Sequence, residues 1–471
     1  MRMRAARATA LALLTAAAMT GCGGSQGPAA KGEDAKATDG AQRPAAMSLP
    51  PAYDGTRGWD ETLPWVPGTD PVAPVAVVPG AKAVALLTQD GAGFAVRSRA
   101  ADSGEVRWGS AIWRPPVLKE GAKEAKEIPD VLAMEQDGRK FVVVSAHGMA
   151  GKDDLHDGTE VVRLAVYDAE GRGSGQKPLR EIDVPVTADA GDWRVSADGG
   201  RLLVGYGEFG RYPQWSSAVD VVTGKVTPYA NPAELLPQCA GKTLECGWAR
   251  VVAAGPNGPL VGLGRGFGVP GGWFGDAVRP EGVNATVSNG LTDEWNGDVY
   301  GVAAGRFLAQ WHRTDKDGSS EPTAWSVHEV ASGRLLARID CAYDDFPSVT
   351  AQGNDRAHPV VSSPSGRFLA AGPVAFDLQR KQGICLQGDG NRKTIAVNTV
   401  GDDGVAYGTV GEDSDGPRFA RLDLTTATGD AKILPVGVEI PQRADVDGAG
   451  SGLFVVRDKD QNIRVSLRPA R

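Results

Sequence analysis

The chain has 471 residues, including 63 Gly and 31 Pro, and aromatic residues make up only 6% of it. This length fits two ordinary domains or one large all-β body, and the Gly and Pro content argues against a helical bundle. The formal net charge of −8 argues against a nucleic-acid partner, because phosphate binding needs a basic surface.

The first 22 residues have the pattern of an export signal. Arg2, Arg4 and Arg7 form a basic start, and residues 8–18 form an apolar stretch too short to span a bilayer. The following Met19-Thr20-Gly21-Cys22 resembles the lipobox of bacterial lipoproteins. The resemblance implies cleavage before Cys22 and a lipid on its sulfur, which would hold the protein on the outer face of the cell membrane. A plain secretory signal with an incidental Cys22 is the alternative.

A segment without large apolar side chains follows. Residues 23–50 consist mainly of Gly, Ala, Ser, Lys, Asp and Pro, a composition that cannot bury a core. We therefore expect a signal peptide at 1–21, the lipidated Cys with a flexible linker at 22–56, and a folded body at 57–471. No later segment has 18 consecutive apolar residues, so we expect no other membrane span.

Four cysteines remain beyond Cys22, and an even number in an exported protein indicates two disulfides. Cys239 and Cys246 would close a short loop, which makes them the preferred pair, and Cys341–Cys385 then follows. The other two pairings and free, buried thiols remain open. The paired CxxC spacing of zinc sites is absent from the sequence.

From residue 75 onwards, a Gly turn recurs in front of a short apolar run. Asp137-Gly138 precedes Phe141–Val144, and Asp403-Gly404 precedes Val405–Tyr407. Asp-Gly between apolar runs is a strong hairpin signal, because the turn needs positive φ. We count eight such turns, roughly 40–60 residues apart, at Gly80, Gly138, Gly199, Gly258, Gly305, Gly366, Gly404 and Gly448.

A second turn, of the form Asp-x-x-Ser/Thr-Gly, lies later in each unit, as at Asp220–Gly224. Each unit then contains four antiparallel strands, which is typical of a β-propeller blade. The last unit, Val446–Leu467, supplies about three strands, so we expect a strand from residues 57–72 to complete it and close the ring. The count predicts eight blades, or seven if one weak unit is an insertion.

Two local patterns resemble known propeller repeats. Asp102–Trp108 is similar to PQQ-like repeats, and Ser196–Leu203 is similar to WD40-like repeats. The resemblance implies an all-β propeller over residues 75 to about 468, and it implies no particular function, because propellers include enzymes, scaffolds and binders. Quinoprotein dehydrogenases carry adjacent cysteines near their cofactor, and no two cysteines are adjacent here. We therefore expect no cofactor.

Motifs for catalysis are missing: the sequence has no GxSxG elbow, no HExxH and no Walker loop. One weak candidate for a metal site is a loop that contains His147, Asp153, Asp154 and His156. A solvated acidic loop is the simpler interpretation of these residues.

Long connections between the second and third strands distinguish the second to fifth units. They cover 147–159, 206–217, 264–276 and 312–323, and they should all open on one face of the propeller. Two of them are rich in aromatic residues: Tyr206, Phe209, Tyr212 and Trp215 in one, and Phe267, Trp273 and Phe274 in the other. These rings either form a recognition surface or pack down to cap the blade cores.

These patterns predict a non-enzymatic, lipid-anchored propeller outside the cytoplasm, monomeric, that binds or scaffolds a protein or a cell-envelope component. The alternative is a propeller enzyme, a quinone- or metal-dependent oxidoreductase or hydrolase that works in the central channel. Converging carboxylates, His or Arg at the channel mouth would favour chemistry, whereas Gly, Ser and apolar residues there would favour a scaffold.

Overall fold

The computed structural model describes residues 46–471 with internal gaps. The residues left out within this range are 64–72, 79, 92, 119–127, 187–192, 210–211, 242–245, 289–292, 315–319, 343–358, 390, 412–416 and 459–461. The predicted signal peptide, the lipidation site Cys22 and the first part of the linker lie outside the described residues. Within the described part of the chain, no helix is both long and apolar enough to cross a membrane.

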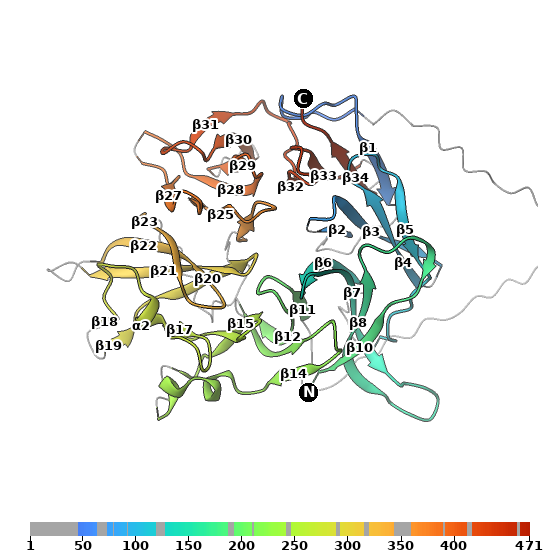
Figure 1. Cartoon of the computed structure of the whole chain (residues 1–471), viewed down its shortest axis with the longest axis horizontal. Helices are drawn as coiled ribbons and strands as arrows, with labels where there is room; N and C mark the ends of the chain where they lie inside the picture. Colours follow the sequence, from blue (N-terminus) through green and yellow to red (C-terminus); the bar gives the residue numbers. More distant parts are fainter. Residues whose placement is uncertain are drawn as a thin grey trace, which may run out of the picture. The chain divides into compact units, whose positions relative to one another are not determined.

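The described residues form antiparallel sheets that succeed one another along the chain (Figure 1). Sheet 1 contains β2 (Val75–Val78), β3 (Ala83–Asp90), β4 (Gly93–Ala100) and β5 (Val106–Ser110), with β9 (Gly173–Gln176) added in parallel. Sheet 2 contains β6 (Asp130–Gln136), β7 (Arg139–Ala150), β8 (Thr159–Asp168) and β10 (Arg180–Pro185). Sheet 3 contains β11 (Trp193–Ser196), β12 (Leu202–Phe209), β13 (Pro213–Val219) and β14 (Val226–Tyr229). Sheet 4 contains only β15 (Arg250–Gly255), β16 (Gly258–Gly262) and β17 (Phe267–Gly268) among the described residues.

The second half of the chain repeats this pattern. Sheet 5 contains β20 (Asp298–Ala303), β21 (Arg306–Thr314), β22 (Ser320–Glu329) and β23 (Leu335–Asp340). Sheet 6 contains β24 (Val361–Ser362), β25 (Phe368–Ala371), β26 (Val374–Asp377) and β27 (Gln382–Cys385), and a parallel contact of β27 with β23, at Gln382 and Arg338, joins it to sheet 5. Sheet 7 contains β28 (Ile395–Val400), β29 (Val405–Val410), β30 (Arg418–Asp423) and β31 (Asp430–Ile433). Sheet 8 contains β32 (Arg443–Ala444), β33 (Gly452–Arg457), β34 (Ile463–Arg468) and β1 (Trp59–Leu63).

Short elements lie between these sheets. They are the 3-10 turns η1 (Pro232–Leu235) and η2 (Pro237–Cys239), the helix α2 (Gly275–Val278), and a hairpin of β18 (Thr286–Ser288) and β19 (Asp293–Trp295). The sequential four-stranded sheets confirm the prediction of an all-β propeller. The number of blades stays a prediction, because sheet 4 has three strands in the part of the chain described here.

The last sheet is completed by the first strand, as the sequence predicts. β1 pairs antiparallel with β34, from Trp59 opposite Leu467 to Leu63 opposite Ile463. The fully buried Arg468 reinforces this joint: its Nη2 donates to Asp60 Oδ1 at 2.6 Å, and its Nη1 donates to the Trp59 carbonyl at 3.0 Å. This pairing covers the edge of β34 that would otherwise be open.

The apolar residues pack between neighbouring sheets. One cluster joins Val78 and Leu87 of sheet 1 to Val142 and Val144 of sheet 2, and equivalent clusters lie between later sheets. The second strands therefore have continuous apolar runs, because a strand covered on both faces has no need of polar alternation. The predicted hairpin turns also form: Asp137 has φ 53° and Gly138 has φ 73°, the pair of positive values that a type I′ turn needs.

Part of the predicted linker belongs to the packed body. The ring of Tyr53 is buried, with its centroid 5.2 Å from that of Phe454 and 6.0 Å from that of Tyr407. Met47 and Leu49 pack against the same cluster. The packed region thus begins before residue 57, because Tyr53 and these apolar residues pack against side chains of sheets 7 and 8.

Sheet 5 contains a buried chain of hydrogen bonds. Trp311 Nε1 donates to Ser326 Oγ at 2.6 Å, and Ser326 Oγ lies 2.7 Å from His328 Nε2. His328 Nδ1 lies 3.0 Å from the Gly333 carbonyl, which can only accept. Nδ1 must therefore carry the proton, and Nε2 accepts the serine hydroxyl. This chain fits a neutral imidazole, and burial accordingly lowers the pKa of His328 to about 4.

We expect acid to destabilise the protein partly through His328. Its pKa is about 4 when folded and about 6.5 when unfolded, so the unfolded chain binds more protons in this window and stability falls as pH falls. Between pH 7 and 4.5 the loss should be about 2.5 kcal/mol, measured by urea unfolding. His328→Gln should remove this part of the pH-dependent loss of stability. The part that comes from His312, whose pKa is also lowered to about 4, should remain. The exposed His156→Gln variant is the control, and an unchanged pH dependence in His328→Gln would contradict the assignment.

Candidate functional site

The long connections and the passages from one sheet to the next share one face. In an up-and-down antiparallel sheet, the link between the second and third strands and the link after the fourth strand lie at the same end of the strands. We call this the long-loop face. Its hairpins are more regular than predicted: β7 continues to Ala150, β12 to Phe209 and β21 to Thr314. Part of three of the predicted loops is therefore strand, whereas 264–276 contains only β17 and the start of α2.

The aromatic residues of sheet 3 mostly pack inwards. Tyr206 is buried and lies opposite the half-buried Trp215 across the strands, and their rings stack with centroids 6.2 Å apart. The buried Tyr212 reaches sheet 5, where its hydroxyl donates to the Val299 carbonyl at 3.3 Å. The side chain of Phe209 lies outside the described residues.

The aromatic residues of sheet 4 pack inwards as well. Phe267 and Phe274 are buried. Trp273 stacks on Phe307 of sheet 5 with centroids 5.3 Å apart and an interplanar angle of 9°. Its Nε1 also donates to the Val330 carbonyl at 3.3 Å. Of the two interpretations left open by the sequence, the structure favours packing of these rings onto the cores.

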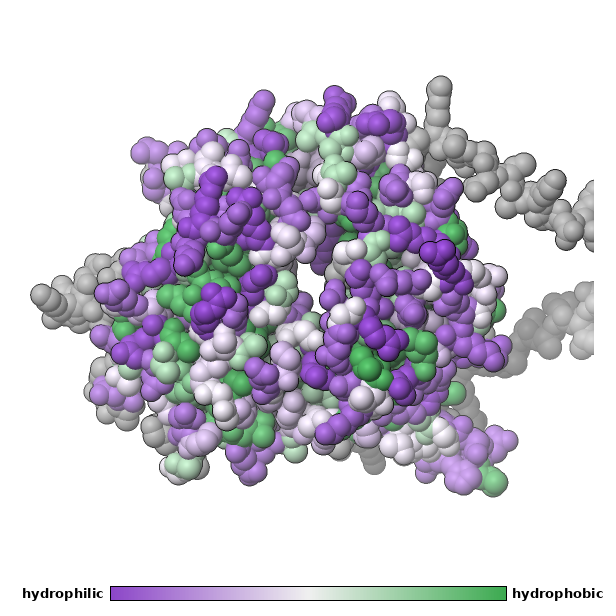
Figure 2. Space-filling view, in the orientation of Figure 1, coloured by the Kyte–Doolittle hydropathy of each residue, from purple (hydrophilic) through white to green (hydrophobic). Residues whose placement is uncertain are grey.

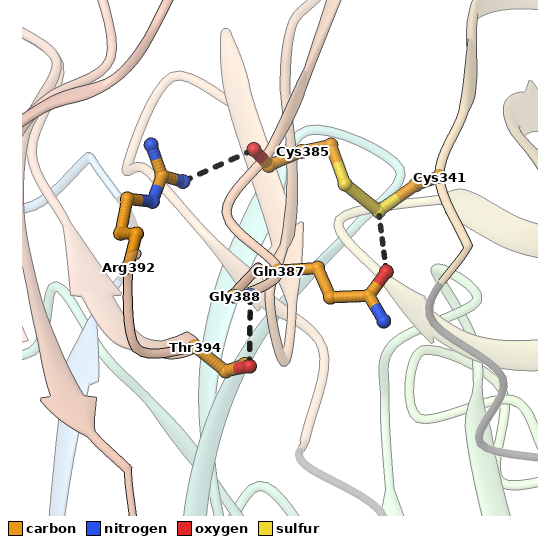
Figure 3. The surroundings of a disulfide bond; sticks show 6 residues. All are labelled: Cys341, Cys385, Gln387, Gly388, Arg392 and Thr394. Carbon is orange, nitrogen blue, oxygen red and sulfur yellow. Dashed lines mark hydrogen bonds between the residues drawn. A yellow bond between two sulfur atoms is a disulfide. The ribbon is translucent and has the colours of Figure 1, made fainter. Parts of the chain in front are cut away.

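Both preferred disulfides are formed. Cys239 and Cys246 have Cα atoms 5.7 Å apart and close the short loop. Cys341 and Cys385 have Cα atoms 5.6 Å apart and join the end of β23 to β27, which links sheets 5 and 6 (Figure 3). In the same region Arg392 Nη2 donates to the Cys385 carbonyl at 3.2 Å, and Gly388 N–H donates to Thr394 Oγ1 at 2.9 Å.

The weak metal candidate separates into two pairs. His147 Nε2 lies 2.9 Å from Glu160 Oε1 across β7 and β8, whereas His156 Nδ1 lies 2.7 Å from Asp153 Oδ1. Asp153 also accepts the backbone N–H groups of Leu155 and His156, as in a turn, and Asp154 is exposed. The described residues contain no group of three or more His, Cys, Asp or Glu that could hold an ion.

A pocket of about 290 Å³ lies beside the Cys239–Cys246 disulfide, on the long-loop face. We call it the disulfide pocket. Its lining includes Gln214, Trp215, Asn231, Pro232, both cysteines and Arg250. Trp248 stands between two lining residues, Gly247 and Ala249, and is 53% exposed. Sequence reasoning missed Trp248 and Arg250, because Trp248 lies in the passage between sheets 3 and 4 and Arg250 is the first residue of β15. The short Cys-Cys loop was the available signal.

Figure 1 places β11 of sheet 3 and β32 of sheet 8 toward the middle of the sheets, where Figure 2 shows an opening. Asp198 follows β11, and Arg443 begins β32. Both side chains are exposed by area, yet burial raises the pKa of Asp198, opposed by the charges of Arg443 and Arg194, and burial lowers the pKa of Arg443. Each group is therefore surrounded by many protein atoms while part of its side chain stays in contact with solvent.

Asp198 and Arg443 bear on the enzyme alternative, for which the sequence analysis asked for converging charged side chains. Asp198 and Arg443 attract each other without any hydrogen bond or ion pair between them in the described contacts. The four His that the structure describes lie elsewhere, on β7, β21 and β22 and in the loop after β7. These two residues therefore offer charge for binding, and no described histidine is among the groups that shift the pKa of either one.

The sequence matches no protein-family model and no curated protein. Solved structures that are similar in fold include the WD40 domain of Toxoplasma gondii coronin, at 10% identity and a TM-score of 0.33 over 90% of this chain and 88% of that chain. The Dos1 propeller is 12% identical, with a TM-score of 0.37 over 87% of this chain and 95% of that one. The polysaccharide lyase Uly1 is 10% identical, with a TM-score of 0.38 over 85% and 91%. These likenesses carry no information on function; the strand topology itself defines the protein as a β-propeller.

Replacing Trp273 should test whether its ring belongs to the core. Trp273→Ala removes the stack on Phe307 and leaves a cavity, so we expect a loss of about 3 kcal/mol in the free energy of unfolding. Trp248→Ala, at the exposed position, should change it by less than about 0.5 kcal/mol. Urea unfolding of the two variants makes the comparison. Equal stabilities would show that Trp273 is not part of the core.

Proposed function

We propose that this protein is an exported lipoprotein, held through Cys22 on the outer face of the cell membrane, whose propeller is a non-enzymatic binding or scaffold module. Its partner would be a protein or another component of the cell envelope. The long-loop face would make the contact, because this face presents the long hairpins, the passages between sheets and the disulfide pocket.

The observation that carries this proposal is the exposure of Trp248. Exposure of a large aromatic ring to water is unfavourable in free energy, and Trp is among the residues that contribute most to binding energy in interfaces. Trp248 follows Cys246 by two residues, so the disulfide restricts the backbone that presents the ring. A ring that is exposed on a restricted loop loses little conformational entropy when a partner covers it. The aromatic residues of the neighbouring hairpins, which the sequence analysis singled out, pack into sheets 3, 4 and 5 and so stabilise the part of the protein that presents this face.

A propeller enzyme is the second candidate function, because Asp198 and Arg443 place opposite charges close enough to act on each other. The opposite charges of Asp198 and Arg443 would suit an enzyme that orients a charged substrate there. Binding at the long-loop face is favoured because no described residue supplies a nucleophile with an adjacent base beside these charges, whereas the exposed Trp248 needs no further group to act.

The anchor is tested by Cys22→Ser. Two acyl chains contribute about 0.8 kcal/mol per buried CH₂ and hold a protein firmly, so their loss should release it into the soluble fraction. Fractionation after a salt wash measures the distribution, and Cys22→Ala should behave in the same way. Retention of the Cys22→Ser protein on washed membranes would contradict the lipid anchor.

The recognition face is tested by Trp248→Ala in native membranes. If Trp248 is a binding hot spot, truncation should cost about 2 kcal/mol or roughly thirtyfold in affinity, measured on the partner recovered by cross-linking and pull-down. Leu155→Ala is the matched control, because Leu155 is 89% exposed on another hairpin of the same face. A partner that binds both variants equally well would exclude Trp248 as the contact.

A further inference from the structure

We propose that the disulfide pocket holds a carboxylate of a protein partner on Arg250, while Trp215 and Trp248 contact an apolar side chain beside that carboxylate. This inference rests on the proposed function and adds the chemistry of the partner's contact segment: an acidic residue next to an apolar one.

Arg250 is a cation without an acidic partner in the described part of the chain. It begins β15, is half-buried, and its Nη1 donates to the Ala249 carbonyl at 2.9 Å. A guanidinium has five N–H donors, and this is its one described hydrogen bond. Burial also lowers the pKa of Arg250, with no nearby carboxylate opposing this effect. A carboxylate that entered the pocket could accept two of the remaining donors in the bidentate geometry typical of Arg.

The rest of the lining combines apolar and polar groups. Trp215 is held by its stack on Tyr206, and Pro232 is buried. The disulfide adds two sulfurs to the same wall. Gln214, with an amide that makes no described hydrogen bond, supplies a polar group beside them. A volume of about 290 Å³ lies at the lower end of ligand pockets, which suits one or two side chains better than a whole molecule.

The charge of the protein favours a protein partner over an acidic glycan. The chain has a formal net charge of −8, so a polyanionic chain would be repelled by most of the surface, whereas a single carboxylate needs only the local attraction of Arg250. Trp and Arg are also the residue types most enriched at protein–protein hot spots. An acidic polysaccharide is therefore kept as an outcome of the test.

The test is a selection of phage-displayed random 12-residue peptides on the full-length protein in detergent. We expect selected peptides to carry Asp or Glu beside an apolar residue. Their affinity, measured by fluorescence anisotropy of the synthetic peptides, should fall at least tenfold with Arg250→Gln and less with Arg250→Lys, which keeps the charge but loses the fork. Arg172→Gln is the charge-matched control, because Arg172 is exposed in the connection between β8 and β9, at the opposite edge of sheet 2.

A second measurement does not depend on the folding of any variant. Replacing the acidic residue of the selected peptide by its amide should weaken binding to the unaltered protein at least tenfold, and binding should weaken with added salt. Affinity that is unchanged by the amide peptide, or a selection that yields no peptide dependent on Arg250, would overturn the proposal. Tight, Arg250-dependent binding of oligogalacturonate that displaces the peptide would also overturn it in favour of a glycan.

These outcomes separate the inference from the proposed function. If the membrane partner depends on Trp248 but not on Arg250, the carboxylate contact is wrong and the binding face stands. If the partner depends on neither residue, the contact face itself is wrong.

Discussion

The pairing of β1 with β34 is the contact on which the rest of this fold depends. It joins residues separated by about four hundred positions and completes the last sheet with the first strand. Each sheet buries apolar residues against the next, so an unclosed ring would expose the faces of its two terminal sheets and the edge of β34. Arg468 makes this joint specific, because a fully buried guanidinium is stable only with its acceptors, Asp60 and the Trp59 carbonyl, in place.

Closure also decides which residues are available for recognition. With the sheets packed in sequence, the hairpins of sheets 3 and 4 lie against sheet 5, and their rings fill the space beside the three-stranded sheet 4. Those rings stabilise the fold and are not available to a partner. The exposed Trp248 is different, because it lies in the passage between sheets 3 and 4, next to a disulfide that closes a short loop within that passage.

Charge is distributed in a related way. Several described arginines pair with carboxylates, as in the contact between Arg163 and Asp183. Arg250 at the disulfide pocket instead makes its one described hydrogen bond to a backbone carbonyl, and burial disfavours its charged form. A half-buried cation without a described carboxylate partner is unfavourable for stability alone, so this position is suited to an anionic ligand.

The propeller fold, the strand that closes it and the preference for the Cys239–Cys246 pair were predictable from the sequence, because Asp-Gly turns, apolar runs and a short Cys-Cys loop are local signals. The Cys341–Cys385 pair remained open among alternatives, because the two residues are 44 positions apart and meet only in the folded chain. The orientation of Trp273 does not follow, because it depends on Phe307 and the Val330 carbonyl in another sheet. The packing of Tyr53 depends in the same way on Tyr407 and Phe454. The disulfide pocket also needed the tertiary structure, since β13, the Cys-Cys loop and β15 must come together before Arg250 and Trp215 line one space. Local patterns determine which strands form, whereas the exposure of a ring or a charge is decided by neighbours that are distant in the sequence.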